Sequence, residues 1–93
     1  MEKNYKDYAL TMKALSDETR LKIFDMLTDG ELCACKILEV FNITQSTLSY
    51  HMKILCESGL VIGRRDGVWI RYSINHNKLE VIAGFFNQVT KNK

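Results

Sequence analysis

The chain has 93 residues, of which 46% are hydrophobic and 26% are charged, and its net charge is +2. These values predict a single globular domain over residues 1–93 and exclude a disordered chain. No apolar run approaches the roughly 20 residues that cross a bilayer, and the first ten residues contain no signal-peptide core. We therefore expect a cytoplasmic protein that makes no membrane contact.

The positive charge is concentrated in the second half of the chain. Residues 1–42 hold six Lys or Arg against eight Asp or Glu, a net charge of −2. Residues 43–93 hold seven against three, a net charge of +4. A localised basic region is typical of a protein that binds a polyanion.

Apolar residues at helical spacing predict three helices in the first half, over residues 5–15, 18–28 and 31–41. Ser16 and Asp17 separate the first two helices and can cap the second, and Gly30 ends the second. The expected apolar faces consist of Tyr5, Tyr8, Met12 and Leu15 in the first helix, Leu21, Phe24 and Leu27 in the second, and Leu32, Leu38 and Phe41 in the third.

Residues 43–60 predict a fourth helix with one apolar and one polar face. Thr44 can cap its start and Gly59 can end it. Leu48, Met52 and Leu55 form the apolar stripe. The opposite face carries hydroxyl, phenol and ammonium groups, which suit phosphate oxygens and base edges; a solvated surface helix is the alternative. These polar residues are Ser46, Ser49, Tyr50 and Lys53.

After Gly59 the pattern changes to strands over residues 60–62 and 68–74, joined by a turn over 64–67 that contains Asp66-Gly67. A last helix is predicted over residues 77–89. We interpret the first and last helices as a dimerisation layer, with closure of the monomer core as the alternative. The fold class is mainly α (α+β): a winged helix-turn-helix with five helices and a β-hairpin wing.

Three cysteines are an odd number for a disulfide scaffold, and a cytoplasmic compartment is reducing, so we expect thiols. Cys33 and Cys35 stand at the start of the third helix, and closely spaced thiolates select soft ions. Residues i and i+2 of a regular helix point about 200° apart. Coordination of one ion by both sulfurs should therefore distort the first turn and move the following helix. Core-filling thiols and a redox or sulfur sensor are the alternatives.

Four segments together resemble the ArsR/SmtB family of metal- and metalloid-responsive winged-helix repressors. They are LSDETRLKIFDML, ELCACKIL, STLSYHMKILCESGLV and GRRDGVWIRYSI, between residues 15 and 74. The resemblance implies a homodimer that binds a roughly palindromic double-stranded DNA operator and leaves it when an inducer binds. It implies no enzyme activity and no obligatory cofactor. A small thiol–disulfide enzyme is not expected, because it would need a Cys-x-x-Cys motif.

The resemblance also implies roles for particular residues. Gln45 is a candidate for adenine, and Lys53 for guanine or phosphate. His51 either packs against the protein or contacts phosphate or a base. The implied DNA-binding residues are Gln45, Ser46, Thr47, Ser49, Tyr50, His51 and Lys53 in the recognition helix, and Arg64, Arg65 and Arg71 in the wing.

The metalloid sensors of this family carry a Cys-x-Cys motif at the place of Cys33 and Cys35. The resemblance therefore implies As(III) or Sb(III) as inducer, with Cd, Pb, Zn or a redox or sulfur signal at the same thiols as the alternatives. These sensors often carry a third cysteine three residues after the second, and Leu38 stands at that position here. They often carry an acidic residue directly after the second cysteine, and Lys36 stands there. The third ligand is then a small thiol, water or Cys56, and Cys56 is otherwise a buried structural residue.

Overall fold

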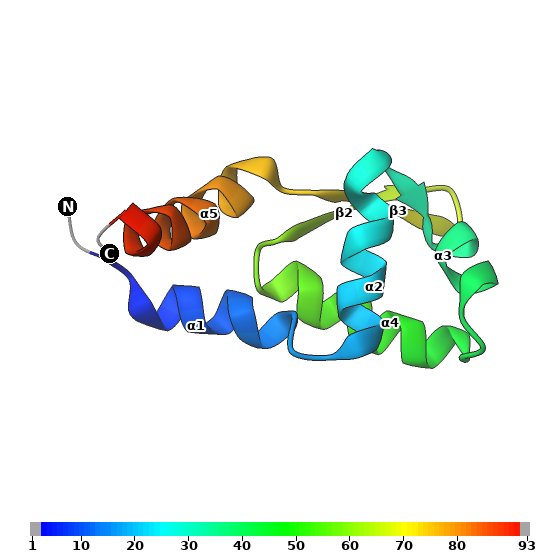
Figure 1. The fold of residues 1–93 in the computed structure, drawn as a ribbon. Helices are drawn as coiled ribbons and strands as arrows, with labels where there is room; N and C mark the ends of the chain where they lie inside the picture. The colour runs from blue at the N-terminus through cyan, green and yellow to red at the C-terminus, as the bar shows by residue number, and fades with distance from the viewer. Residues whose placement is uncertain (1–2, 92–93) are drawn as a thin grey trace.

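The computed structural model describes residues 3–91, which form five α-helices, a 3₁₀ turn and a three-stranded antiparallel sheet. In chain order these are α1 (Tyr5–Ala14), α2 (Glu18–Met26), η1 (Leu27–Asp29), β1 (Leu32–Cys33), α3 (Ala34–Val40), α4 (Gln45–Glu57), β2 (Val61–Asp66), β3 (Trp69–Ile74) and α5 (His76–Lys91). Figure 1 shows α2, α3 and α4 near the sheet, while α1 and α5 both extend towards the same end of the molecule. The predicted five helices and hairpin wing are confirmed.

Side chains at the helix ends fix the boundaries of α2 and α4. The Asp17 carboxylate accepts a hydrogen bond of 3.1 Å from the backbone N–H of Arg20, and this bond holds the pKa of Asp17 below its ordinary value. The Thr44 hydroxyl likewise accepts a 3.1 Å bond from the N–H of Thr47. After α4, Gly59 has φ +87°, a conformation that glycine adopts readily. The predicted caps of both helices are therefore confirmed.

One apolar core joins α2, α3, α4 and the sheet. The predicted stripe of α4 is confirmed, because all three of its residues are buried. The largest fully buried apolar side chains are Ile23, Leu27, Ile37, Met52, Leu55 and Leu60.

Two predicted core faces differ from the observed ones. In α2, Leu21 is 51% exposed and Ile23 is fully buried, because this helix has apolar residues on both sides and packs against α4 through the side of Ile23. In α3, Ile37 is the fully buried residue. The residues expected there, Leu32, Leu38 and Phe41, are only partly buried against the core.

Strand β1 was not predicted, since residues 31–33 were expected to begin a helix. It pairs with β3 through Leu32 opposite Tyr72 and Cys33 opposite Arg71. β2 pairs with the other side of β3, which gives the order β1-β3-β2. A strand of two residues is too short to show an alternating pattern, so the sequence could not reveal it.

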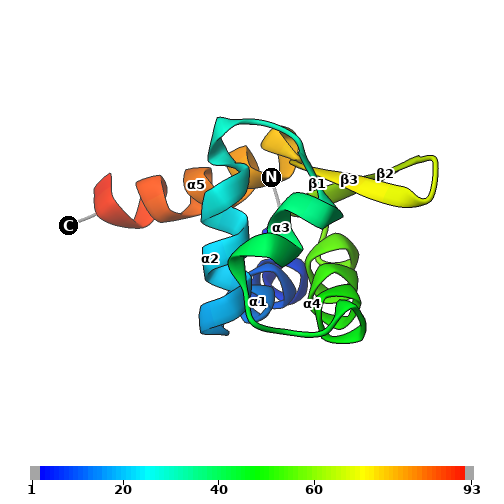
Figure 2. The same cartoon turned by 90° about the vertical axis from the view of Figure 1, so that its right-hand side faces the viewer.

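The hairpin of the wing is longer than predicted. β2 continues to Asp66, opposite Trp69, and the turn consists of Gly67 and Val68. Gly67 has φ +67°, which the tight turn requires. Arg64 and Arg65 therefore lie in the strand, not in the turn, and Figure 2 shows the hairpin projecting from the body of the molecule.

Helices α1 and α5 occupy one end of a molecule that measures 45 × 23 × 23 Å (Figure 1), and two side-chain contacts join them. Asp7 and Lys78 form an ion pair of 2.5 Å, and the ring centroids of Tyr8 and Phe85 are 5.1 Å apart. Several large apolar side chains of these helices remain exposed: Leu10, Val81, Phe86 and Val89. Within residues 3–91, no helix has the length and hydropathy to cross a bilayer.

Candidate DNA interface and thiol site

The polar residues of α4 are open to solvent. Helix packing against the core turns the apolar stripe inwards, so the other side chains project outwards. Tyr50 is 61% exposed although its ring is large and mostly apolar. The exposed set is Gln45, Ser46, Thr47, Ser49, Tyr50 and Lys53. Six of the seven residues expected to reach DNA from this helix are therefore accessible.

The seventh residue, His51, is half-buried and binds Arg20. The guanidinium Nη1 of Arg20 lies 3.1 Å from Nδ1 of His51. A guanidinium can only donate, so Nδ1 accepts this bond and carries no proton in this arrangement. The same Arg20 donates from Nε to the carbonyl of Ala14 at 2.7 Å. Arg20 thus connects the end of α1, the start of α2 and the middle of α4.

A groove runs between α4 and the wing. Its lining includes Ser49 and Lys53 from α4, together with Arg65 from β2 and Tyr72 from β3. The two positive groups and the hydroxyl of Ser49 on this concave surface suit the phosphate backbone of a nucleic acid. Cys56 also lines this groove, and burial raises the pKa of its thiol.

The three wing arginines do not occupy equivalent positions. Arg64 pairs with Arg71 and Arg65 pairs with Ile70 in the β2–β3 register. Neighbouring residues of a strand project to opposite faces, whereas directly opposed residues share a face. Arg65 therefore faces the α4 groove, while Arg64 and Arg71 occupy the other face of the hairpin.

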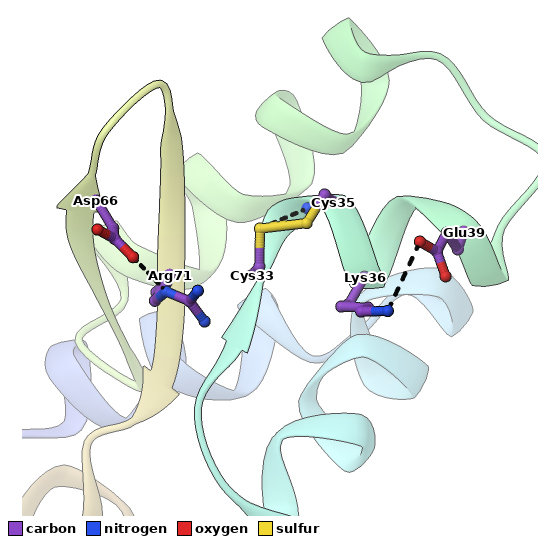
Figure 3. The surroundings of a disulfide bond; sticks show 6 residues. All are labelled: Cys33, Cys35, Lys36, Glu39, Asp66 and Arg71. Atoms are coloured by element: carbon purple, nitrogen blue, oxygen red, sulfur yellow. Dashed lines mark hydrogen bonds and ion pairs between the residues drawn. A yellow bond between two sulfur atoms is a disulfide. The ribbon is translucent and has the colours of Figure 1, made fainter.

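On that other face, Arg64 and Arg71 are bound to carboxylates. Arg64 Nη2 lies 2.8 Å from Glu31 Oε1, and its Nε lies 3.3 Å from Oε2 of the same carboxylate. Arg71 Nε lies 2.6 Å from Asp66 Oδ2 (Figure 3). Each hydrogen-bonded arginine holds the pKa of its carboxyl partner, Glu31 or Asp66, below the ordinary value. Within residues 3–91, Arg65 makes no ion pair.

The two cysteines lie at the junction of β1 and α3. Cys33 is the N-cap of α3, with φ −68° and ψ 142°, so its backbone is extended and not helical. Its sulfur accepts a hydrogen bond of 3.2 Å from the N–H of Cys35. The Cα atoms of the two residues are 5.2 Å apart, and a disulfide joins their sulfurs (Figure 3).

This geometry corrects two expectations from the sequence. Both sulfurs were expected to point apart and to require a distorted helix before they could share one ion. The extended backbone of Cys33 already places them together, because only Cys35 belongs to the helix. The pair was also expected as free thiols, whereas the structure contains a disulfide, although one that encloses a single residue and connects no distant elements.

Among the residues that the structure describes, no third protein ligand lies beside the pair. Within residues 3–91, no three His, Cys, Asp or Glu side chains are grouped so that they could hold a metal ion. The structure therefore does not bring Cys56 together with Cys33 and Cys35. Two thiolates alone do not complete the four-coordinate shell that Zn²⁺ takes in structural sites.

Sequence reasoning missed two residues that matter here, Arg20 and Glu31. Their partners are His51 and Arg64, which lie 31 and 33 positions away along the chain. Spacing within one helix or strand carries no signal for such contacts. The sequence shows that Arg20 and Glu31 are charged, but it does not show which side chain each of them binds in the folded protein.

The chain is similar to known regulators. The family described as "Bacterial regulatory protein, arsR family" matches residues 17–62. The arsenical resistance operon repressor of Staphylococcus aureus is 48% identical over 84 residues, which cover 90% of this chain and 81% of that protein. A cadmium resistance transcriptional regulatory protein CadC homolog from the same organism is 36% identical over 90 residues, 94% of this chain and 74% of that protein.

The fold is similar to solved structures as well. The homodimeric winged helix-turn-helix DNA-binding domain of a possible ArsR-family regulator from Mycobacterium bovis superimposes with a TM-score of 0.75 at 29% identity. The match covers 95% of this chain and 81% of that one. These likenesses agree with the helix-turn-helix and wing described above, and they confirm the expectation of a regulator and not an enzyme. The chain is therefore a member of the arsR family of transcriptional regulators.

Proposed function

We propose that this protein is a homodimeric repressor that leaves its operator when a trivalent metalloid, As(III) or Sb(III), binds Cys33 and Cys35. The observation that carries the proposal is the position of the two sulfurs, which lie together at the N-terminus of α3, immediately before α4. The relatives named as arsenical resistance operon repressors support the choice of ion. Action on DNA agrees with the cytoplasmic location expected from the sequence.

On the DNA side, α4 enters the major groove and the wing contacts the flanking backbone. Gln45 and Ser49 read base edges, Lys53 binds guanine or phosphate, and Arg65 binds phosphate from the wing. The open polar face of α4 and the groove with two cations support these roles. His51 supports DNA binding indirectly, because its hydrogen bond to Arg20 holds α4 against α2. The remaining contacts to DNA are assigned to Ser46, Thr47 and Tyr50 in α4, with Arg64 and Arg71 as secondary phosphate ligands.

On the thiol side, the reduced pair replaces two hydroxyl groups of arsenous acid. Two As–S bonds form and two As–O bonds break, and the thiol protons leave with the hydroxyl groups as two water molecules. The third position on arsenic is filled by hydroxide or a small thiol, because the described part of the chain offers no third protein ligand. Binding at the Cys33 sulfur also competes for the atom that caps α3, which links occupancy to the helix that precedes α4.

Dimer formation uses the exposed apolar faces of α1 and α5. Five large apolar side chains remain open there, including Tyr5, and the Mycobacterium bovis relative is a homodimer. A two-fold axis would place two α4 helices on successive major grooves, so the operator should be roughly palindromic.

The test is an operator-binding titration of the reduced protein with As(III), Sb(III), Cd(II) and Zn(II). Wild type is compared with the Cys33→Ala/Cys35→Ala variant and with Cys56→Ala as the matched control. We expect release by As(III) and Sb(III) from wild type and from Cys56→Ala, and none from the double variant. Release that persists in the double variant would falsify the assignment of the sensor.

The disulfide favours a redox sensor as the second candidate function. Oxidation of the two thiols releases two protons and two electrons, and a peroxide accepts them to form two waters. Titration of the operator complex with hydrogen peroxide, without any metal, separates the candidates. Release by peroxide that dithiothreitol reverses would support the redox function, and unchanged binding of the fully oxidised protein would exclude it.

A further inference from the structure

We propose that Glu31 is a positioning residue that couples the state of the Cys33–Cys35 pair to the wing, so that the thiol site acts on DNA through the hairpin as well as through α4. The inference rests on the proposed function for its consequence at the operator. Its physical basis is the sheet, which joins the thiol site directly to the hairpin.

The first link is the backbone pairing of β1. Cys33 lies opposite Arg71 on β3, and Arg71 lies opposite Arg64 on β2. These three residues therefore form one row across the three strands, and directly opposed residues project from the same face. Figure 3 shows the cysteine pair beside β3, with Arg71 and Asp66 on the hairpin. A movement of β1 is thus transmitted to β3, the middle strand of the sheet and one of the two strands of the wing.

The second link is the side chain of Glu31, which precedes β1 and reaches across β3 to β2. Its two carboxylate oxygens accept hydrogen bonds from Nη2 and Nε of Arg64, at 2.8 and 3.3 Å. A two-point contact between a planar guanidinium and a carboxylate fixes direction as well as distance. Glu31 lies two residues before Cys33. A change in the backbone at the cysteine pair therefore shifts the backbone position from which the Glu31 side chain extends.

Together the two links span the whole sheet on the face opposite the α4 groove. Arg71 is held by Asp66 on that same face, which completes a row of ion pairs along the hairpin. Each exposed ion pair contributes little by itself, so the coupling should be modest and graded. The wing should change its local stability with the state of the thiols, without unfolding.

The test is amide hydrogen exchange in the free protein, with no DNA present. Exchange in residues 62–74 is compared between the disulfide form, the dithiol form and the dithiol form saturated with As(III). In wild type we expect a change of up to about fivefold between the disulfide and dithiol forms, the size that an exposed ion pair allows. In Glu31→Gln this change should fall by at least half, whereas exchange in α5 should stay the same in all forms.

The matched control is Glu39→Gln, which removes an exposed carboxylate on α3 that pairs with Lys36 and not with the wing. It should respond as wild type does. The charge swap Glu31→Arg with Arg64→Glu should restore the response, which a purely structural loss would not do. Equal exchange of the wild-type wing in the disulfide and dithiol forms, or a wild-type response in Glu31→Gln, would overturn the proposal.

Operator titrations run in parallel separate the two ideas. Release of DNA with no response in the wing would leave the proposed function intact and refute the coupling. A response in the wing with no release of DNA would support the coupling and refute the proposed function.

Discussion

Substitution of Arg65 by Ala should remove one phosphate contact from each wing. Arg65 projects into the α4 groove and makes no ion pair within residues 3–91, while Arg64 and Arg71 are already bound to carboxylates. Each phosphate contact contributes about 0.9 to the magnitude of the slope of log K against log salt. A dimer carries two copies of Arg65, so the slope of the Arg65→Ala dimer should be about 1.8 smaller in magnitude. When salt rises from roughly 50 to 200 mM, wild type should therefore weaken about twelvefold more than the variant.

The assay is fluorescence anisotropy with the operator and with a scrambled duplex, over a range of salt concentrations. The slope should fall equally on both duplexes, since phosphate contacts carry no sequence information. Lys22→Ala removes the same charge from α2, where Lys22 pairs with Glu18, and should leave the slope unchanged. An unaltered slope in Arg65→Ala, or a loss confined to the operator, would refute the assignment of this arginine to phosphate.

Four further expectations concern stability and reactivity. Leu55→Ala should lower the free energy of unfolding by about 2–5 kcal/mol in urea titrations, because Leu55 is fully buried; a loss below the range would mean that the core refills the cavity. Thr44→Ala should cost about 1 kcal/mol through loss of the α4 cap, and Thr44→Ser should recover most of it. Gly67→Ala should cost roughly 1 kcal/mol from backbone strain alone, since nothing lies within 4 Å of an added Cβ atom; an unchanged melting temperature would contradict this. Because burial raises the pKa of Cys56, its alkylation near pH 8 should be slower in the folded than in the urea-unfolded chain. The free energy of unfolding should decrease only as pH rises above the ordinary thiol pKa, because the unfolded chain then loses this proton first.

Local patterns were sufficient to predict most helices and the hairpin. The caps at Asp17 and Thr44 and the left-handed Gly59 depend on residues within one turn of the helix end, so they are visible in sequence. The stripe of α4 was visible for the same reason. The choice of Ile23 over Leu21 as the core residue of α2 was not, because the partner helix decides which apolar side is covered.

The candidate site was predicted as a set of residues but not as an arrangement. The exposed face of α4 followed from helical periodicity alone. The division of the wing arginines into one that faces the groove and two bound to carboxylates required the strand register, which extends β2 beyond the predicted turn. The meeting of the two sulfurs required β1, a strand that exists only because β3 is available to pair with it.

The cap made by Cys33 has a consequence for the choice of substitutions at this position. Sulfur is a weak acceptor, whereas a serine hydroxyl is among the best helix caps. A serine at position 33 would therefore remove a ligand and at the same time strengthen the start of α3, so a repressor carrying it could stay on DNA for either reason. Alanine removes both the ligand and the cap. Comparison of the serine and alanine variants at position 33 thus separates the loss of the ligand from the change in helix stability. The strength of this single helix cap is then a means of tuning the sensitivity to the inducer.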